Sequence, residues 1–384
     1  MRTIWISAVL GATLLVTGAA PSGAQADDDL TRALLSGGRQ FTEPPAATDL
    51  EGIRIGTGDT AARPRTPMSA CWRGDELAIA DLSRRMVLVF AESGRLLRTI
   101  GSRGTGPGQF MRLSMVRCSA GDAAFLAADL GTHRLSFFDS SGALLHTART
   151  PDVPQIDILG GYALMDDGTW FESWLGTDVP IGPYLSPAQW RGVPLVRRFG
   201  ASGDSIGAFG QPKPYEDRVA RRVLNRLFMT IASDTLWTLT QGDATVRAFL
   251  PTGEQVLSDI QLPVYFRGRD PKVELGKGHP ASDFLPNRMA YDPNVQDVAV
   301  VLDSLLLTAR YADWGFKLVT EGGIALQRMA RSTLELANRR GEVVRAYNVP
   351  GTVLAVESDG ARRVAVITRL RDDSRAVFIA RLPR

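Results

Sequence analysis

The sequence predicts an all-β protein: a six-bladed β-propeller of four-stranded antiparallel blades, with the ring closed by an N-terminal strand. The first observation is a repeat, because Asp81 and Asp129 are 48 residues apart. Gly94 and Gly142 have the same separation. The second is that each copy alternates short apolar runs with Gly-Asp and Ser-Gly turns, as in hairpin-connected strands. The third is that the runs are almost continuously apolar, as expected for blades packed on both faces.

The N-terminus has the features of a secretory signal peptide. Arg2 precedes an apolar run over residues 4–16, and small residues then end in Ala24-Gln25-Ala26. This pattern predicts an A-x-A cleavage site, so residues 1–26 are expected to be removed and the mature protein to be periplasmic or secreted. An uncleaved membrane anchor is the alternative. After cleavage we expect no transmembrane segment, because no later apolar run is long enough to cross a bilayer.

Composition limits the kind of partner. The 384 residues include 44 Lys and Arg against 41 Asp and Glu, a formal net charge of +3. Residues 1–26 contain one arginine and no acidic residue, so the mature chain carries +2. This balance is far from the basic footprint of a nucleic-acid-binding protein, so no nucleic-acid partner and no dense basic surface are expected.

The first two blades follow the pattern most clearly. In the first, strands are expected at 77–80, 87–90 and 96–100, with turns at Gly74-Asp75 and Ser93-Gly94. The corresponding apolar runs of the second blade are 123–128, 134–139 and 144–145. Weaker copies predict the other four blades, with strands in the ranges 162–171 and 194–199, 233–240 and 245–250, 303–308 and 333–337, and 359–367 and 376–380.

Insertions and a leader account for the remaining length. Residues 27–48 are expected to form a poorly ordered leader before a propeller over 49–384. Insertions are predicted near 211–229, 264–297 and 312–332. Apolar residues at helical spacing over 215–229 predict a short amphipathic helix in the first of them. The second is rich in Pro, Gly and charge and reads as a long loop.

Residues 52–56 are predicted to close the ring. The run Gly52-Ile-Arg-Ile-Gly56 precedes the first blade and has no partner of its own. We expect it to add a strand to the last blade, which leaves no free edge where the ring closes.

The glycine-rich stretch from Gly101 to Phe110, Gly-Ser-Arg-Gly-Thr-Gly-Pro-Gly-Gln-Phe, resembles the loop between blades of the NHL repeat. The matching positions that follow are Asp129, His133, Arg134 and Gly142. Thr132 stands where Asn is usual in that family. The resemblance covers residues 70–150 and implies a propeller similar to those exported by bacteria. Such relatives include binding scaffolds, protein-interaction modules and a few enzymes, so the resemblance implies no single activity.

The two cysteines, Cys71 and Cys118, lie at similar places in the first two blades. An even number of cysteines in an exported chain favours a disulfide. The alternative is a pair of buried thiols, because a bridge needs Cα atoms within about 7 Å.

No catalytic residue, cofactor or metal site is predicted. The mature chain has three histidines, His133, His146 and His279, at unrelated places in the repeat pattern, which does not resemble a metal-ligand set. Asp81 and Asp129 could belong to a ring of Ca²⁺ ligands. Stabilisation of a turn is favoured, because aspartate accepts hydrogen bonds from nearby backbone amides and later blades hold no aspartate there.

A partner surface is predicted from two groups of residues. Trp170, Trp174 and Trp190 cluster in the third blade and would offer large contact areas to a saccharide or peptide. Core packing is the alternative for these rings. Arg218 and Arg222 lie in the predicted helix and would attract an anionic lipid or polysaccharide, or simply face solvent.

These observations favour a monomeric, non-catalytic binding or assembly scaffold with a protein or glycan partner in the cell envelope. The alternative is a propeller enzyme, a lyase or lactone hydrolase, with a divalent metal in the central channel.

Overall fold

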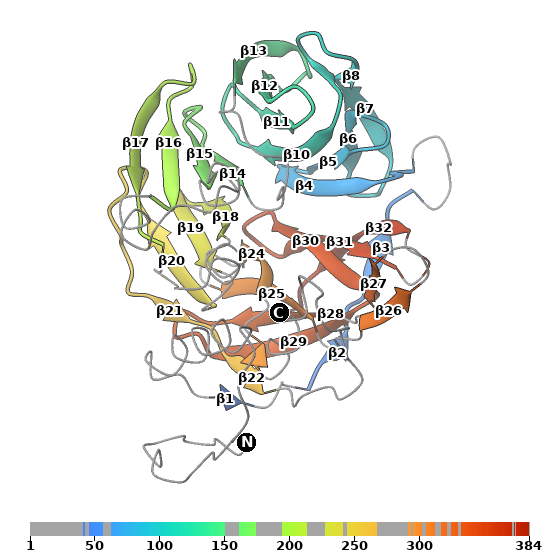
Figure 1. Ribbon diagram of the computed structural model, residues 1–384, viewed down its shortest axis with the longest axis vertical. Helices are drawn as coiled ribbons and strands as arrows, with labels where there is room; N and C mark the ends of the chain where they lie inside the picture. The colour runs from blue at the N-terminus through green and yellow to red at the C-terminus, as the bar shows by residue number, and fades with distance from the viewer. Residues whose placement is uncertain are drawn as a thin grey trace.

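The protein is a six-bladed β-propeller, which confirms the predicted fold class (Figure 1). The computed structural model describes residues 41–42, 46–56, 63–149, 161–173, 194–212, 227–240, 244–266, 291–292, 295–301, 305–311, 316–320, 324–328, 332–370, 372 and 374–383. Every regular element within these residues is a strand. Each blade is built on antiparallel strands that follow chain order, apart from the N-terminal strands added to blades 5 and 6. The first strands of neighbouring blades contact one another around the axis.

The first three blades are built from consecutive hairpins. Blade 1 contains β4 (Pro67–Arg73), β5 (Glu76–Asp81), β6 (Met86–Ala91) and β7 (Leu96–Ile100). Blade 2 contains β10 (Leu113–Cys118), β11 (Phe125–Asp129), β12 (Arg134–Phe138) and β13 (Leu144–Arg149). Blade 3 contains β14 (Tyr162–Leu164), β15 (Trp170–Ser173), β16 (Val196–Phe199) and β17 (Ser205–Phe209). Between blades 1 and 2, the glycine-rich loop forms a small parallel pair of β8 (Ser102–Arg103) and β9 (Gln109–Phe110).

The other three blades complete the ring. Blade 4 contains β18 (Leu227–Ala232), β19 (Thr235–Thr240), β20 (Thr245–Phe249) and β21 (Ile260–Gln261). Blade 5 contains β24 (Val295–Val301), β25 (Leu305–Tyr311), β28 (Ser332–Ala337) and β29 (Val343–Val349). Blade 6 contains β30 (Thr352–Ser358), β31 (Arg363–Arg369), β32 (Arg375–Arg381) and the N-terminal β3 (Gly52–Arg54).

The core lies between the blades. The buried hydrophobic residues of the described chain form six clusters, one at each blade–blade interface. Between blades 1 and 2, for example, Val87 and Val89 pack with Phe125 and Phe138. Because each blade contributes apolar residues to two interfaces, its central strands are apolar on both faces, as the sequence predicted.

Glycine shapes the hairpin before the outer strand in blades 1 to 5. Gly142 has φ +92°, a conformation that side chains rarely adopt. A Cβ at this position would also lie 2.9 Å from Ile100 of blade 1, so the turn of blade 2 packs closely against its neighbour. The repeated glycine therefore serves both turn geometry and blade packing.

The N-terminal strand closes the ring, as predicted. β3 pairs antiparallel with β32, with Gly52 opposite Ala380 and Arg54 opposite Phe378. Ile55 N also donates to Val377 O at 2.9 Å. One sheet thus contains both ends of the propeller sequence.

Arg363 adds a polar contact across the same closure. Its guanidinium binds Asp359 within blade 6 and Asp75 and Glu92 of blade 1, at 2.7, 2.6 and 3.3 Å. It also lies 4.9 Å from the ring centroid of Trp72. These partners hold the pKa of Arg363 above its usual value despite the opposing effect of desolvation. Blades 6 and 1 are therefore joined by charge as well as by apolar packing.

Three expectations for the insertions and leader are corrected or refined. Residues 227–229, predicted as the end of a helix, begin strand β18, and residues 213–226 lie outside the described residues. The predicted interruption of blade 5 contains the hairpin β26 (Phe316–Thr320) and β27 (Ile324–Arg328). In the leader, β1 (Phe41–Thr42) is a strand rather than poorly ordered chain, and β2 (Thr48–Asp49) follows at the leader's end.

These leader strands attach to blade 5 and to the neighbouring insertion. β2 pairs in parallel with β29, as a fifth strand of that blade. β1 pairs in parallel with β22 (Val264–Phe266), which pairs in turn with β23 (Tyr291–Asp292). The predicted 264–297 loop therefore supplies two strands of a three-stranded sheet, β22 and β23, while residues 267–290 lie outside the described residues.

Candidate functional site

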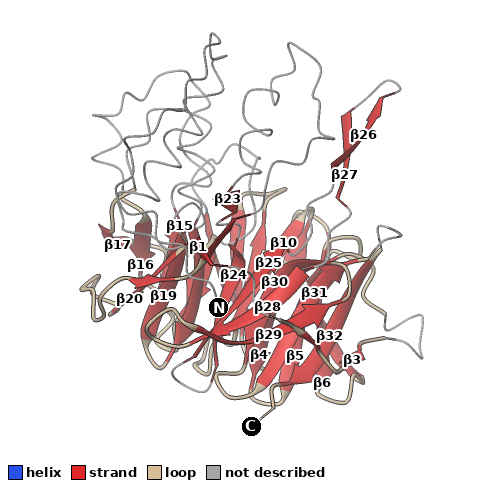
Figure 2. Cartoon of the chain, turned by 90° about the horizontal axis from the view of Figure 1, so that it is seen from below, coloured by secondary structure: helices blue, strands red, loops and turns tan. Residues whose placement is uncertain are grey.

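The two ends of the ring carry different connections. At one end, first strands lead to second strands and third to fourth through short turns such as Gly74-Asp75 and Ser141-Gly142. At the other end lie β22, β23, β26 and β27, together with the turns at 82–85 and 130–133 (Figure 2). We call the first end the turn face and the second the insertion face.

Asp81 organises the insertion face of blade 1. Its side chain is buried at the end of β5. The carboxylate accepts hydrogen bonds from the backbone amides of Arg65, Thr66 and Arg84. It therefore joins the segment before the blade to the turn between the second and third strands.

Asp129 does the same in blade 2. Its buried carboxylate accepts the amides of Met111 and Arg112 at 3.0 and 2.6 Å, and that of Gly131 at 3.1 Å. The Thr132 hydroxyl donates to it at 2.7 Å. Turn stabilisation, the favoured interpretation of both aspartates, accounts for these contacts. No group of three or more His, Cys, Asp or Glu residues in the described part of the chain could hold a metal ion.

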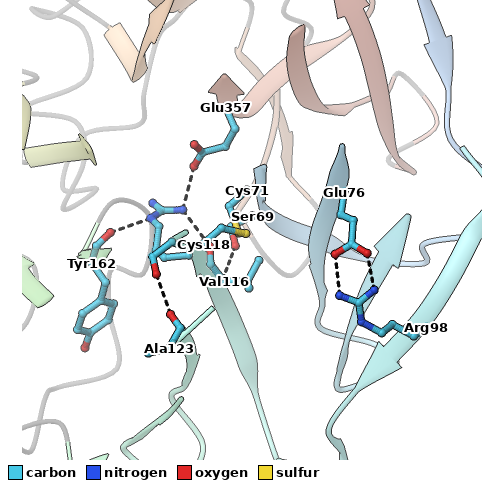
Figure 3. The surroundings of a disulfide bond; sticks show 11 residues. Ser69, Cys71, Glu76, Arg98, Val116, Cys118, Ala123, Tyr162 and Glu357 are labelled. Atoms are coloured by element: carbon cyan, nitrogen blue, oxygen red, sulfur yellow. Dashed lines mark hydrogen bonds and ion pairs between the residues drawn. A yellow bond between two sulfur atoms is a disulfide. The ribbon is translucent and has the colours of Figure 1, made fainter. Parts of the chain in front are cut away.

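Cys71 and Cys118 form a disulfide between the innermost strands of blades 1 and 2 (Figure 3). Their Cα atoms are 5.5 Å apart, within the range that a bridge requires. Nearby, the backbone N–H of Val116 donates to the Ser69 hydroxyl at 2.7 Å. The innermost strands of these adjacent blades therefore approach closely enough for a disulfide. The sequence alone did not decide between a disulfide and two buried thiols.

Arg117 extends these links to two further blades. Its Nε donates to Tyr162 O of blade 3 at 2.7 Å, and its Nη1 to Glu357 Oε1 of blade 6 at 3.0 Å. Figure 3 shows Tyr162 and Glu357 in the surroundings of the disulfide. The side chains of Arg117 and Glu357 are only 11% and 14% exposed. The innermost strands of blades 2, 3 and 6 are thus tied together near the channel.

The structure describes one of the five residues predicted for a partner surface. Trp170 is buried at 1% exposure and stacks on Phe199, with ring centroids 4.0 Å apart, so it belongs to the core and not to a partner surface. Core packing was the stated alternative. The remaining predicted surface residues, Trp174, Trp190, Arg218 and Arg222, lie outside the described residues.

The histidines that the structure describes have local roles. His133 occupies the turn of blade 2 with φ +50°. His146 stacks on Phe137, with centroids 4.3 Å apart. His279 lies outside the described residues.

The insertion face also contains a group of arginines that the sequence interpretation missed. They lie on the segments and turns that Asp81 and Asp129 hold in place. The six are Arg63, Arg65, Arg84, Arg85, Arg103 and Arg112. They are dispersed along the chain, so a net charge of +3 gives no sign of them. The sequence signal that could have indicated this group is the presence of arginine in the loops that precede the first strands of blades 1 and 2.

Comparisons with known proteins support the fold. Residues 66–171 match a family described as a 6-bladed beta-propeller. A Bacteroides fragilis protein described as a "putative exported protein" is 12% identical to this chain. The two structures match with a TM-score of 0.52, over 89% of this chain and 99% of the Bacteroides chain. A DUF4221-family protein from Bacteroides vulgatus is 10% identical with a TM-score of 0.54, over 87% and 98%. None of the curated proteins matches the sequence.

Among the described residues, no helix has the length and apolar character needed to cross a bilayer.

Proposed function

We propose that this six-bladed β-propeller is an exported, monomeric, non-catalytic scaffold that binds a protein or glycan of the cell envelope. The observation that carries the proposal is the position of the additional strands. β22–β23 and β26–β27 both rise from the insertion face, whereas the turn face is made of short turns (Figure 2). Long additions on one side of a rigid scaffold are a common arrangement for binding surfaces.

Two further features support export. The N-terminal sequence has the pattern of a signal peptide. The Cys71–Cys118 disulfide suits an oxidising compartment, because cytosolic thiols are kept reduced. Fractionation of cells that express the full chain tests this part: the protein is expected in the periplasm or medium with Asp27 as its first residue. Recovery of uncleaved protein in the cytosol would contradict it.

A pull-down from envelope extract tests the scaffold. The full mature chain is compared with a variant in which a short Gly-Ser linker replaces residues 267–290, so that β22 and β23 remain. The matched control carries the same linker inserted at Ser202 on the turn face. We expect the first variant to lose partners that the control keeps. Identical partners for all three proteins would remove the insertion face as the binding surface.

The enzyme alternative makes a separate prediction. A lyase or lactone hydrolase with a channel metal would contain stoichiometric Ca²⁺ or Zn²⁺ after purification. Chelation would then lower its melting temperature, because a ligand that binds only the folded state stabilises it. Elemental analysis with melting curves before and after chelation separates the two functions.

A further inference from the structure

The outermost strand of blade 3 is an open sheet edge at the rim of the ring (Figure 1). β17 pairs with β16 on one side, and no other described strand pairs with it. Residues 205–208 are all exposed, and the side chain of Ile206 is large, apolar and 47% exposed. An open edge presents unpaired backbone N–H and C=O groups, so it can pair with an added strand.

The other outermost strands are short or carry charge, and both features discourage pairing with another chain. Within the described residues, β7 contains Arg98, β13 contains Arg149 and β3 contains Arg54. β2 and β21 are each two residues long. β17 has five residues, and none of them is charged. It is therefore the outermost strand that is least protected against an added strand.

Gly207 lies in the middle of β17, where the packing of the described chain does not require a glycine. The other glycine within a described strand is Gly52 of β3, and a Cβ there would lie 2.9 Å from Ile379 O of the neighbouring strand. A Cβ at Gly207 would meet open space, and its φ is not positive. Glycine weakens a strand interior and often marks a place where a ligand or another backbone approaches closely. Gly207 therefore points to an approach from outside the described chain.

The open position at Gly207 continues a row of aromatic rings. Residues two apart in a strand share a face, so Gly207 lies on the same face of β17 as Phe209. The Phe209 ring packs against Phe171 and Phe249, with centroid distances of 6.2 and 5.1 Å. Aromatic side chains on a neighbouring strand cover glycines at sheet edges. An aromatic residue on an added strand, opposite Gly207, would extend this row of rings.

Blades 5 and 6 show that outer edges of this ring accept added strands. β2 pairs in parallel with β29 through two residues, and Leu50 N donates to Asn348 O at 3.0 Å. β3 pairs with β32 through three residues. Both added strands belong to a segment that is attached to the propeller, and such a tether raises the local concentration, so that a short pairing suffices. With five residues, β17 is long enough for the same kind of pairing.

We propose that β17 pairs with an extended, uncharged polypeptide segment of the scaffold's partner, which places an aromatic residue opposite Gly207. Pairing with a strand edge requires a polypeptide, because the N–H and C=O groups of a backbone repeat at the spacing of the strand. The inference therefore selects protein over glycan as the partner class, and it rests on the proposed scaffold function for its biological role.

A second copy of this chain is the less suitable occupant. A stable interface uses about 20–30 residues on each side, whereas the edge of β17 offers five. A partner that is also held by the insertion face does not need a larger contact at the edge, because its extended segment is then tethered like β2.

A synthetic peptide, acetyl-Thr-Val-Tyr-Val-Thr-amide, tests the pairing with the full mature protein. One comparison peptide is N-methylated at its three central residues, and the other has Ala in place of Tyr. We expect saturable binding of the first peptide and at least tenfold weaker binding of both comparison peptides, which lack the backbone donors or the ring. Hydrogen exchange should slow at residues 205–209 and stay unchanged in β13. Equal binding of the N-methylated peptide, or protection that omits β17, would overturn the proposal.

Gly207→Lys locates the site. The substitution adds a charge to the edge without a clash, because a Cβ at this position meets open space. We expect it to weaken binding of the Tyr peptide at least tenfold. The matched control is Gly161→Lys, since Gly161 also belongs to blade 3, has open space at its Cβ position and has no positive φ. The control should change binding less than twofold, and equal weakening by both variants would overturn the site.

Further outcomes separate this inference from its alternatives. If Gly207→Lys does not fold, Ile206→Lys is used with the same expectation. Sedimentation measures the oligomeric state: a dimer of the natural protein that Gly207→Lys dissociates would make a second copy the occupant and overturn the proposal. If the Tyr peptide does not bind while the linker variant at 267–290 still loses envelope partners, the β17 edge fails and the scaffold stands. If the peptide binds as expected and the linker variant keeps all partners, the edge stands and the insertion face fails.

Discussion

Arg117 and Glu357 meet at 3.0 Å although they come from the innermost strands of blades 2 and 6, which are not adjacent in the ring. Blade 1 lies between these two blades. The ion pair therefore spans the inner side of blade 1 and fixes the spacing of the two blades that flank it. Its location suggests a structural role that can be measured directly.

Replacement of Glu357 by Gln should lower the free energy of unfolding by about 1–3 kcal/mol, because it leaves the little-exposed Arg117 charge without its carboxylate partner. Urea denaturation measures the change. Glu254→Gln is the control, since Glu254 is exposed in a turn between β20 and β21. Equal stability of the two variants would contradict a structural role for the pair.

The disulfide should stabilise the propeller substantially. Cys71 and Cys118 are 47 residues apart, and closing a loop of that length stabilises a protein by about 4 kcal/mol in the chain-entropy description. The double variant C71S/C118S should lose stability of this order relative to the oxidised natural protein. Reductant should lower the midpoint of urea denaturation of the natural protein. It should leave the midpoint of the C71S/C118S variant unchanged. A shift of both would show that the reductant acts elsewhere.

Removal of the Asp129 carboxylate should release the segment before β10. Asp129→Ala leaves three backbone amides and the Thr132 hydroxyl without their acceptor, so a loss of about 2–3 kcal/mol is expected. Hydrogen exchange at Met111 and Arg112 should accelerate more than exchange in β11. The control is Asp122→Ala, an exposed position in a turn of the same blade. Unchanged exchange at these amides would show that Asp129 does not hold the segment.

The ion pair of Glu76 and Arg98 predicts a pH dependence. Hydrogen bonds from Arg98 hold the pKa of Glu76 below its ordinary value. A lowered pKa in the folded state stabilises the protein above the unfolded pKa, about 4.3, and this contribution disappears as the pH falls through the folded pKa.

Glu76→Gln should therefore reduce stability at pH 7 by about 0.5–1 kcal/mol. The difference between the two proteins should shrink when melting curves are recorded at pH 3. A constant difference across this range would exclude ionisation of Glu76 as the cause.

Much of the fold was predictable because it repeats. Asp81 and Asp129 fixed the period, and the unpaired run at 52–56 indicated how the ring closes. Residues 215–229 misled the interpretation, because apolar residues at positions 227 and 228 suit a helix and the start of a strand equally well. β18 forms because these residues pair with β19, while Leu227 packs between blades 3 and 4 and Phe228 packs between blades 4 and 5. Such contacts between distant residues are not visible in local spacing.

The candidate site was less predictable. The sequence separation of Cys71 and Cys118 does not give the distance between their Cα atoms. The disulfide could therefore be established only from the three-dimensional structure. Trp170 looked suitable for binding because aromatic residues serve surfaces and cores alike. The expectation of no dense basic surface stays a prediction, although folding places arginines from three separate connections at one end of the ring. The NHL likeness, the signal peptide and the roles of Trp174, Trp190, Arg218 and Arg222 stay predictions.

The pairing of β3 with β32 sets an order of events during synthesis. Residues 52–54 leave the ribosome early, whereas their partner strand lies within the last ten residues of the chain. Five blades can assemble while the sixth lacks β32, the strand that pairs with β3, so a nascent or C-terminally truncated chain keeps an open seam. The finished propeller is then a product of the complete polypeptide, and proteolysis near the C-terminus would reopen it.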